Sequence, residues 1–176
     1  MSQDIKRNNS VGGRIMGIDF GSKRIGISIS DPTLTIAQGL FVLENNSGIF
    51  DEIKKVCAQY DVNLIVVGLP LSLSGNYSSK TAEVLKFIDE LKSRLGIKVV
   101  KWDERLTTKI AQKSKIDMNL KRKKRQNKNL DDIISSTLIL QSYLDFLKNK
   151  EKVIEQDEVY FQSQSPLFSR QQNYFS

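Results

Sequence analysis

The segment RIMGIDFGSKRIGISIS, residues 14–30, restricts the possible folds more than any other part of the chain. It predicts a strand, a tight turn at Gly21-Ser22, and a second strand in which isoleucine alternates with small residues. One carboxylate, Asp19, falls near the end of the first apolar strand, where a buried charge costs several kcal/mol unless a cation meets it. The segment therefore predicts a hairpin whose acid either helps to hold a metal ion or builds a polar turn.

The rest of the chain alternates apolar strands with amphipathic helices. LIVVGL, residues 64–69, is continuously apolar, which is typical of a parallel strand covered on both faces. Three early strands followed by alternating helices and strands indicate a mixed-sheet α/β domain over residues 14–150. We expect a loose polar arm at residues 1–13 and a flexible polar tail at residues 151–176. The elements expected after the hairpin are strands at 39–44, 64–69 and 97–102, a helix capped by Asn46 or Ser47, and helices near 79–95, 107–117 and 130–147.

The chain has no histidine and a single cysteine, Cys57. This composition excludes a Ser-His-Asp triad, a Cys-His pair and the histidine and cysteine sites that zinc prefers. Cys57 lies on the apolar stripe of a predicted helix, so we expect a core residue. Any chemistry must use carboxylates, hydroxyls, lysine or arginine, and such oxygen ligands suit Mg²⁺ or Mn²⁺.

Membrane insertion and secretion are not expected. No apolar run approaches the roughly 20 residues that a bilayer span needs. The first residues, MSQDIKRNNSVGG, lack the apolar stretch of a secretory signal. We expect a soluble intracellular protein with no membrane partner.

The net charge of +7 is concentrated in one segment. Residues 101–128 hold eleven Lys or Arg against three Asp or Glu, so the whole cationic excess lies there. This distribution favours a polyanion that touches one side of the molecule, although a solvated lysine-rich loop would give the same count. The residues expected to contact phosphates in the densest part are Lys121, Arg122, Lys123, Lys124 and Arg125.

Three acids fall where sheet-based folds place their sites: Asp19 at the end of the first strand, Glu104 at the end of the last, and Asp132 at the start of the final helix. Carboxylates brought together without a cation would raise each other's pKa, so their convergence predicts metal binding. Each acid also has a structural alternative. Asp19 could cap its turn, Glu104 could pair with Arg105 or a lysine, and the helix acid could favour the helix N-terminus.

Two of these acids have an acidic neighbour that must be distinguished from them. On an extended strand, Asp103 and Glu104 point to opposite faces, so one of them is expected to share the site of Asp19. On the final helix, the stripes through Asp131 and Asp132 are both plausible inner faces. Periodicity alone leaves that choice open.

Four motifs stand in one order along residues 14–146: GIDFGSKRIGISISDP (17–32), VVGLPLSLSG (66–75), WDERLTT (102–108) and LDDIISSTLILQSYL (130–144). Together they resemble the YqgF family, whose members are called Holliday-junction resolvases or pre-16S rRNA nucleases. The resemblance implies a ribonuclease-H-like fold: a five-stranded mixed sheet flanked by helices. It also implies a cytoplasmic phosphodiester hydrolase that depends on Mg²⁺ or Mn²⁺.

The resemblance assigns roles to residues by motif. It implies that Asp19 and Glu104 are catalytic and metal-binding, and it selects Asp132 over Asp131 as the third acid. The residues that match its cationic turn and its DERLTT element, and are expected to contact substrate, are Lys23, Arg24, Arg105, Thr107 and Thr108. Two departures stand out: Ser72 replaces the asparagine of the GLPLN loop, and Ser135-Ser136 replace alanines, which preserves small residues for close packing.

The expected function is metal-dependent cleavage of structured nucleic acid, in particular processing of the 5′ end of pre-16S rRNA, by a monomer or a homodimer. One alternative is a DNA resolvase of the Holliday-junction type, and another is a nucleic-acid-binding factor without catalysis. An ATPase of the actin and sugar-kinase type would need a second Gly-rich phosphate loop and an adenosine-binding segment, which the sequence lacks. Trp102 could stack on a base, but an aromatic residue in a central strand is expected in the core.

Overall fold

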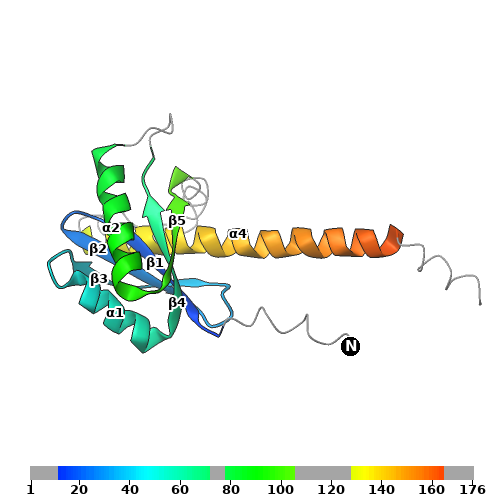
Figure 1. The fold of residues 1–176 in the computed structure, drawn as a ribbon, viewed down its shortest axis with the longest axis horizontal. Helices are drawn as coiled ribbons and strands as arrows, with labels where there is room; N and C mark the ends of the chain where they lie inside the picture. The colour runs from blue at the N-terminus through cyan, green and yellow to red at the C-terminus, as the bar shows by residue number, and fades with distance from the viewer. Residues whose placement is uncertain (1–11, 72–77, 106–127, 165–176) are drawn as a thin grey trace, which may run out of the picture. The chain divides into compact units, whose positions relative to one another are not determined.

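The computed structural model describes residues 12–71, 78–105 and 128–164, with side chains as far as Lys150 (Figure 1). Four features expected from the sequence lie outside the described residues: Ser72, the helix at 107–117 with Thr107 and Thr108, the basic cluster at 121–125, and the polar arm at 1–11. In the described part of the chain, no helix is long and apolar enough to cross a membrane.

The opening hairpin forms as predicted. Strands β1 (Arg14–Phe20) and β2 (Arg24–Ser30) pair antiparallel, with Asp19 opposite Gly26. The turn is closed by the backbone N–H of Gly21, which donates to the carbonyl of Arg24 at 2.9 Å. The third strand, β3 (Ala37–Glu44), pairs antiparallel with β2 and begins two residues earlier than expected.

The remaining strands are parallel and complete a five-stranded mixed sheet. Strand β4 (Val62–Leu69) runs parallel to β1 on one side and to β5 (Lys98–Asp103) on the other, giving the order β3-β2-β1-β4-β5. The expected fold class is therefore confirmed. Because β1, β4 and β5 are parallel, their carboxyl ends meet at one edge of the sheet, where Asp19 and Glu104 lie.

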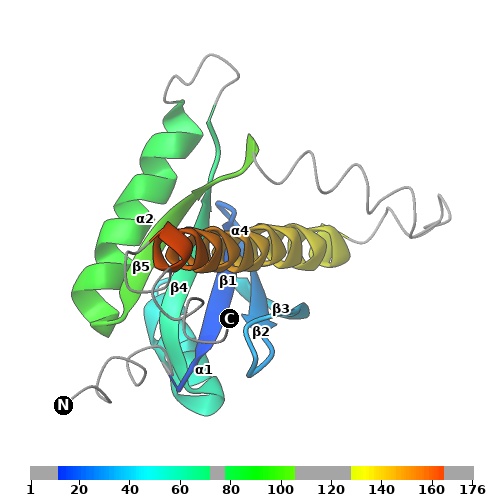
Figure 2. The same cartoon turned by 90° about the vertical axis from the view of Figure 1, so that its right-hand side faces the viewer.

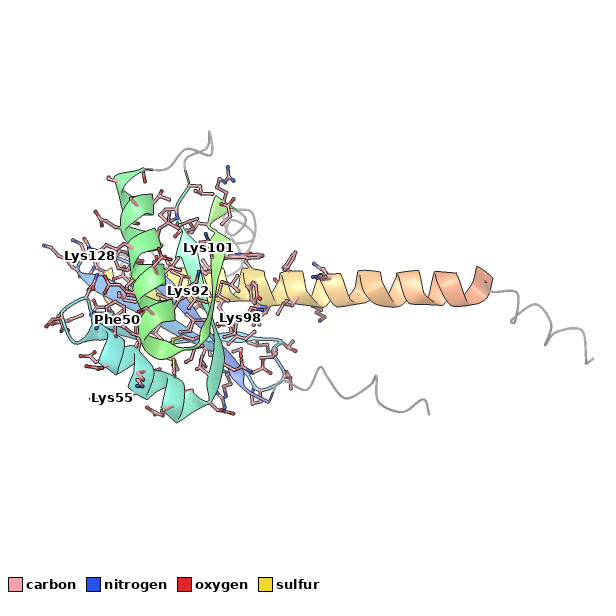
Figure 3. All side chains as sticks on the ribbon, in the orientation of Figure 1. Phe50, Lys55, Lys92, Lys98, Lys101 and Lys128 are labelled. Carbon is pink, nitrogen blue, oxygen red and sulfur yellow. The ribbon has the colours of Figure 1, made fainter. Side chains whose placement is uncertain are left out.

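Strand β5 is an edge strand of the sheet. It carries Lys98 and Lys101, both exposed, and Figure 3 shows these side chains with Lys92 of the neighbouring helix. Lysines on an edge strand discourage pairing with a second chain.

Helices α1 (Ile49–Tyr60) and α2 (Ser79–Leu95) cover one face of the sheet (Figures 1 and 2). The N-cap of α1 is Gly48, so the expected cap at Asn46 or Ser47 was wrong. The side chain of Asn46 instead accepts from the N–H of Gly48 at 2.9 Å, in the turn before the helix. Helix α2 ends as expected, because Gly96 adopts a left-handed conformation with φ of 66°.

The core lies between these two helices and the sheet. The isoleucines of β2 face it, together with apolar residues of β1, β4, α1 and α2. Cys57 belongs to this core, as expected. The alternation of isoleucine with small residues in β2 therefore separates two faces of one strand, with the small residues on the opposite face.

The opposite face of the sheet receives the N-terminal part of helix α4 (Lys128–Gln164), drawn in yellow in Figure 2. Glycines on four strands allow a close approach of this helix. A Cβ added at Gly26 would lie 2.1 Å from the carbonyl oxygen of Asp132, and one added at Gly17 would lie 2.7 Å from the Cβ of Leu140. A Cβ added at Gly39 would likewise lie too close to the side chain of Ile133, and one added at Gly68 too close to the side chain of Ile139. This face is lined by small residues because the backbone of a helix, and not only its side chains, lies against it.

Helix α4 continues to Gln164, well past the expected end near Leu147. Residues 151–164 are helical where the sequence pattern predicted a flexible tail. The segment from 128 to 164 contains no Gly or Pro and is rich in Glu, Lys and Gln, so each further residue extends an existing helix at little cost.

Residues up to Leu144 form one compact unit and residues from Asp145 a second. The domain boundary at residue 150 stays a prediction.

Candidate active site

Three elements bring the predicted acids to the edge of the sheet where β1, β4 and β5 end. Asp19 is the sixth residue of β1, and Asp132 lies in the first turns of α4. Glu104 follows β5 directly, and its backbone N–H donates to the carbonyl of Leu69 at 3.3 Å, which ties the end of β5 to the end of β4.

Asp19 and Glu104 form a partly buried carboxylate pair. Burial raises the pKa of Asp19; Lys80 opposes this shift, the charge of Asp132 adds to it, and a hydrogen bond from Ser135 opposes it. Burial also raises the pKa of Glu104, and the charge of Asp19 adds to that shift while Lys80 opposes it. The charge of Asp19 therefore makes ionisation of Glu104 more costly, and the charge of Lys80 favours ionisation of both carboxyl groups.

Lys80 and Ser135 are site residues that the sequence did not reveal as such. Lys80 lies in the first turn of α2, whose start is fixed by a capping box between Ser78 and Thr81. The buried Thr81 hydroxyl also donates to the carbonyl of Pro70 at 2.5 Å, so the helix begins against the end of β4. The one available signal was topological, because helix starts and strand ends meet at the same edge of such a sheet.

Asp132 makes an ion pair with Arg24, the first residue of β2. The Nε of Arg24 donates to Oδ2 of Asp132 at 2.8 Å, and both side chains are partly exposed. Asp131 is exposed. Of the two helical stripes that periodicity left open, the one through Asp132 thus faces the sheet.

The neighbours Asp103 and Glu104 have separate partners, as the strand geometry predicted. Arg105 donates from Nε and Nη2 to Asp103, with the Nη2 contact at 2.6 Å. This pairing lowers the pKa of Asp103. Glu104 lies on the other side, where its Oε1 would be 2.9 Å from a Cβ at Gly68. Arg105 therefore pairs with Asp103 in the structure, and not with Glu104 as the alternative had it.

Trp102 belongs to the core and not to an exposed binding surface. Its side chain is 8% exposed, its indole N–H donates to the hydroxyl of Ser142 at 3.1 Å, and its ring meets Tyr143 edge-on. Of the other expected substrate contacts, Lys23 is exposed in the hairpin turn.

The chemistry of the acid pair suits a divalent cation. Carboxyl groups whose pKa is raised by partial burial and by a neighbouring negative charge are stabilised by a cation, and their oxygens are the ligands that Mg²⁺ and Mn²⁺ prefer. Among the described residues, no three acidic or sulfur side chains are grouped closely enough to hold a metal ion, so the expected cage of three acids stays a prediction. The third acid is paired with Arg24.

A five-stranded mixed sheet in this order, flanked by helices, is the ribonuclease-H-like fold. The fold is similar to that of a solved structure described as "T. thermophilus RuvC in complex with Holliday junction substrate", with a TM-score of 0.51 and 16% identity, covering 76% of this chain and 96% of that chain. The model of the RuvX family, described as Holliday junction resolvase, matches residues 13–146. The chain belongs to this family, and the resemblance seen in the sequence is confirmed.

Two bacterial relatives support the same assignment. A protein of Clostridium botulinum (strain Hall) is 43% identical over 136 residues, covering 76% of this chain and 98% of its own length. A protein of Thermoanaerobacter pseudethanolicus is 43% identical over 140 residues, covering 78% of this chain and 99% of its own length. Both are named "Putative pre-16S rRNA nuclease".

Proposed function

We propose that this protein is a cytoplasmic, divalent-metal-dependent nuclease that processes the 5′ end of pre-16S rRNA. The observation that carries the proposal is the partly buried Asp19–Glu104 pair at the carboxyl edge of the sheet in a chain of the RuvX family. The names of the relatives support ribosomal RNA as the substrate.

Asp19 and Glu104 are the residues that would hold Mg²⁺ or Mn²⁺. When bound, such an ion lowers the pKa of a water molecule and offsets charge on the phosphodiester. Ser135 orients the carboxylate of Asp19 through its hydrogen bond, and Lys80 adds a positive charge beside both acids. Partial burial of the pair reduces the screening of these charges by water.

Cationic residues would bind the backbone of the substrate strand. Lys23 and Arg24 in the hairpin, and the cluster at Lys121–Arg125, would contact phosphates without reading bases. Affinity is then expected to fall steeply with salt.

The direct test is cleavage of three substrates: a precursor-rRNA fragment spanning the mature 5′ end, a four-way DNA junction and a linear duplex. With Mg²⁺ or Mn²⁺ we expect the precursor to be cut. Asp19→Asn and Glu104→Gln should each lose more than about 100-fold in rate, because loss of even an indirect support of a metal ligand costs 10–100-fold. Glu90→Gln, at a partly exposed acid of α2 that pairs with Arg94, is the matched control and should cleave like the wild type.

The same panel decides between this proposal and its alternatives. Cutting of the junction alone would indicate a DNA resolvase, as the family description and the RuvC neighbour favour. Binding that survives Asp19→Asn, with no cleavage by either form, would indicate a nucleic-acid-binding factor. Thermal stabilisation by ATP would favour the ATPase alternative. A homodimer would suit a two-fold junction and a monomer a single RNA strand, so the oligomeric state is measured on the same samples.

A further inference from the structure

The C-terminal part of helix α4 carries a repeat of apolar pairs. The match to the family model ends at residue 146, whereas α4 continues to Gln164. Residues seven apart in a helix are separated by almost two full turns, so a repeat of seven keeps residues on one side of it. Six of the seven large apolar residues in 145–164 follow such a repeat, as the pairs Phe146-Leu147, Val153-Ile154 and Tyr160-Phe161.

A helix with such an apolar side is stabilised when a second element packs on it. Helices in proteins gain most of their stability from packing of this kind rather than from propensity. Residues from Asp145 onward form a compact unit of their own, and Phe146, at the start of the repeat, is 48% exposed. A repeat of seven over three successive pairs is typical of a surface on which a second helix lies along the first.

Two charged residues on the same side of the helix indicate which second helix fits. Lys150 stands between the first and second apolar pairs, and Asp157 between the second and third. Both are equally far from the midpoint between Val153 and Ile154. When two copies pair antiparallel about a two-fold axis at that midpoint, Lys150 of each copy lies level with Asp157 of the other. Parallel pairing would instead place lysine level with lysine and aspartate level with aspartate.

The apolar pairs and the remaining charges agree with the same axis. Antiparallel pairing places the first apolar pair level with the third pair of the other copy, and the two middle pairs level with each other. Residues 148–153 contain three lysines and one glutamate, whereas residues 154–159 contain three acids and no base. An antiparallel arrangement thus brings a basic half beside an acidic half, and a parallel one brings like charges together.

We infer that residues 145–164 form an antiparallel helix–helix interface with a second copy of this chain, with its two-fold axis between Val153 and Ile154. A second copy is the partner that fits, because one axis matches both the apolar pairs and the charges of the segment to themselves. The interface lies almost entirely beyond the residues that the family model matches. Asp19 and Glu104 belong to one chain, so each copy keeps its own acid pair and needs no residue from the other.

The test is sedimentation equilibrium of the full-length chain over a concentration series, without nucleic acid or metal. We expect a reversible equilibrium between monomer and dimer. Ile154→Gln changes the centre of the interface twice in each dimer and should weaken self-association about 10-fold or more. Val159→Gln is the matched control, because it removes the one large apolar residue of the segment that lies on the opposite side of the helix. This variant should dimerise like the wild type.

Charge reversals test the direction of the two helices. Lys150→Asp and Asp157→Lys each place like charges level with one another in the antiparallel pair, so each should weaken the dimer. The double variant restores opposite charges and should regain most of the lost affinity. Lys148→Asp makes the same change of charge on the opposite side of the helix, at an exposed residue, and should have a much smaller effect.

Three outcomes would overturn the inference. The chain could remain monomeric at every concentration, or Ile154→Gln could weaken a dimer no more than Val159→Gln does. Single charge reversals without effect, or a double variant no better than the single ones, would exclude the antiparallel axis. Recovery in the double variant requires a folded helix, so it also distinguishes a lost contact from a lost fold. None of these measurements uses cleavage, so failure of the proposed function leaves them unaffected.

Discussion

Asp19 combines burial, a negative neighbour and a hydrogen bond in one carboxyl group. The largest influence on its pKa is burial, which raises it, followed by Lys80, Asp132 and Ser135. A raised pKa means that the folded protein disfavours the ionised form. The group is therefore held at a cost to stability, as is common for residues kept for function.

Asp19→Asn is expected to abolish cleavage and also to stabilise the fold at neutral pH, by about 1 kcal/mol in the free energy of unfolding. The folded protein binds the Asp19 proton more tightly than the unfolded chain does. The cost of ionising Asp19 in the folded protein therefore lowers the free energy of unfolding at pH values above its raised pKa. This cost is lost as the pH falls through the raised pKa toward the ordinary value of 3.8. Urea unfolding in EDTA across a pH series tests this.

The gain in the free energy of unfolding from Asp19→Asn should become smaller as the pH falls. Asp89→Asn, which changes an exposed acid on α2, is the control and should show no such gain. A variant no more stable than the wild type at pH 7, or an advantage that grows toward acid pH, would contradict the prediction.

Cys57 gives a probe of unfolding. Burial raises the pKa of its thiol from 9.0 to about 11, and the residue is 4% exposed. At pH 8 this shift lowers the thiolate fraction about 100-fold, and the thiolate is the reactive species. We expect a thiol reagent to label the native protein very slowly and to modify one thiol per chain in urea. Rapid stoichiometric labelling of the native protein would show that the α1–sheet core is more open than the structure indicates.

At the level of residues, the sequence identified Asp19, Glu104 and Asp132 but not their partners. Strand ends and helix starts mark where a side chain emerges, so acids at those points could be singled out. The partners Lys80, Ser135 and Arg24 depend on distances across the fold. An isolated lysine in a helix carries no pattern from which such a distance follows.

At the level of elements, the approach of α4 to the sheet depends on glycine. Gly17, Gly26, Gly39 and Gly68 stand on four different strands, on the face that this helix crosses. The sequence suggested close packing here through its small residues. It could not show that the glycines face one helix, because that requires the register of all four strands.

Gly26→Ala should therefore destabilise the protein by about 1–3 kcal/mol, the usual cost of overpacking. The new methyl would lie 2.1 Å from the carbonyl oxygen of Asp132, so the helix must move. Gly12→Ala is the matched control, since a Cβ there meets no atom within 4 Å. Urea unfolding of both variants is the measurement, and equal stability of Gly26→Ala and the wild type would refute the close approach.

The helix ends show both the strength and the limit of local patterns. Gly96 ends α2 as its sequence position predicts, because the left-handed conformation favours glycine. The start of α1 at Gly48 was missed, since Asn46 and Ser47 are also good caps and tertiary packing selects among adjacent candidates. The length of α4 was underestimated because helix propensity can continue after an apolar stripe has ended.

For the whole molecule, the uneven charge makes a quantitative prediction about binding. Replacing Lys121–Arg125 with glutamine should weaken RNA binding at low salt. It should also reduce the slope of log affinity against log salt by about 0.7–0.9 for each phosphate that the cluster no longer neutralises. Lys98→Gln with Lys101→Gln, on the exposed edge strand β5, is the control and should leave the slope nearly unchanged. An unchanged slope in the first variant would mean that the cluster does not touch the nucleic acid.

The sequence alone determined the hairpin, the buried parallel strand, the order of the elements and the family, because these follow from periodicity and from motifs close together in the chain. It also placed the acids at element ends. Only the tertiary structure decided which charged groups these acids meet: Lys80 beside Asp19 and Glu104, and Arg24 beside Asp132. Ionic partners are set by distances of a few ångströms between residues far apart in sequence. Arg24 and Asp132, for example, are 108 positions apart, and no local pattern encodes their contact.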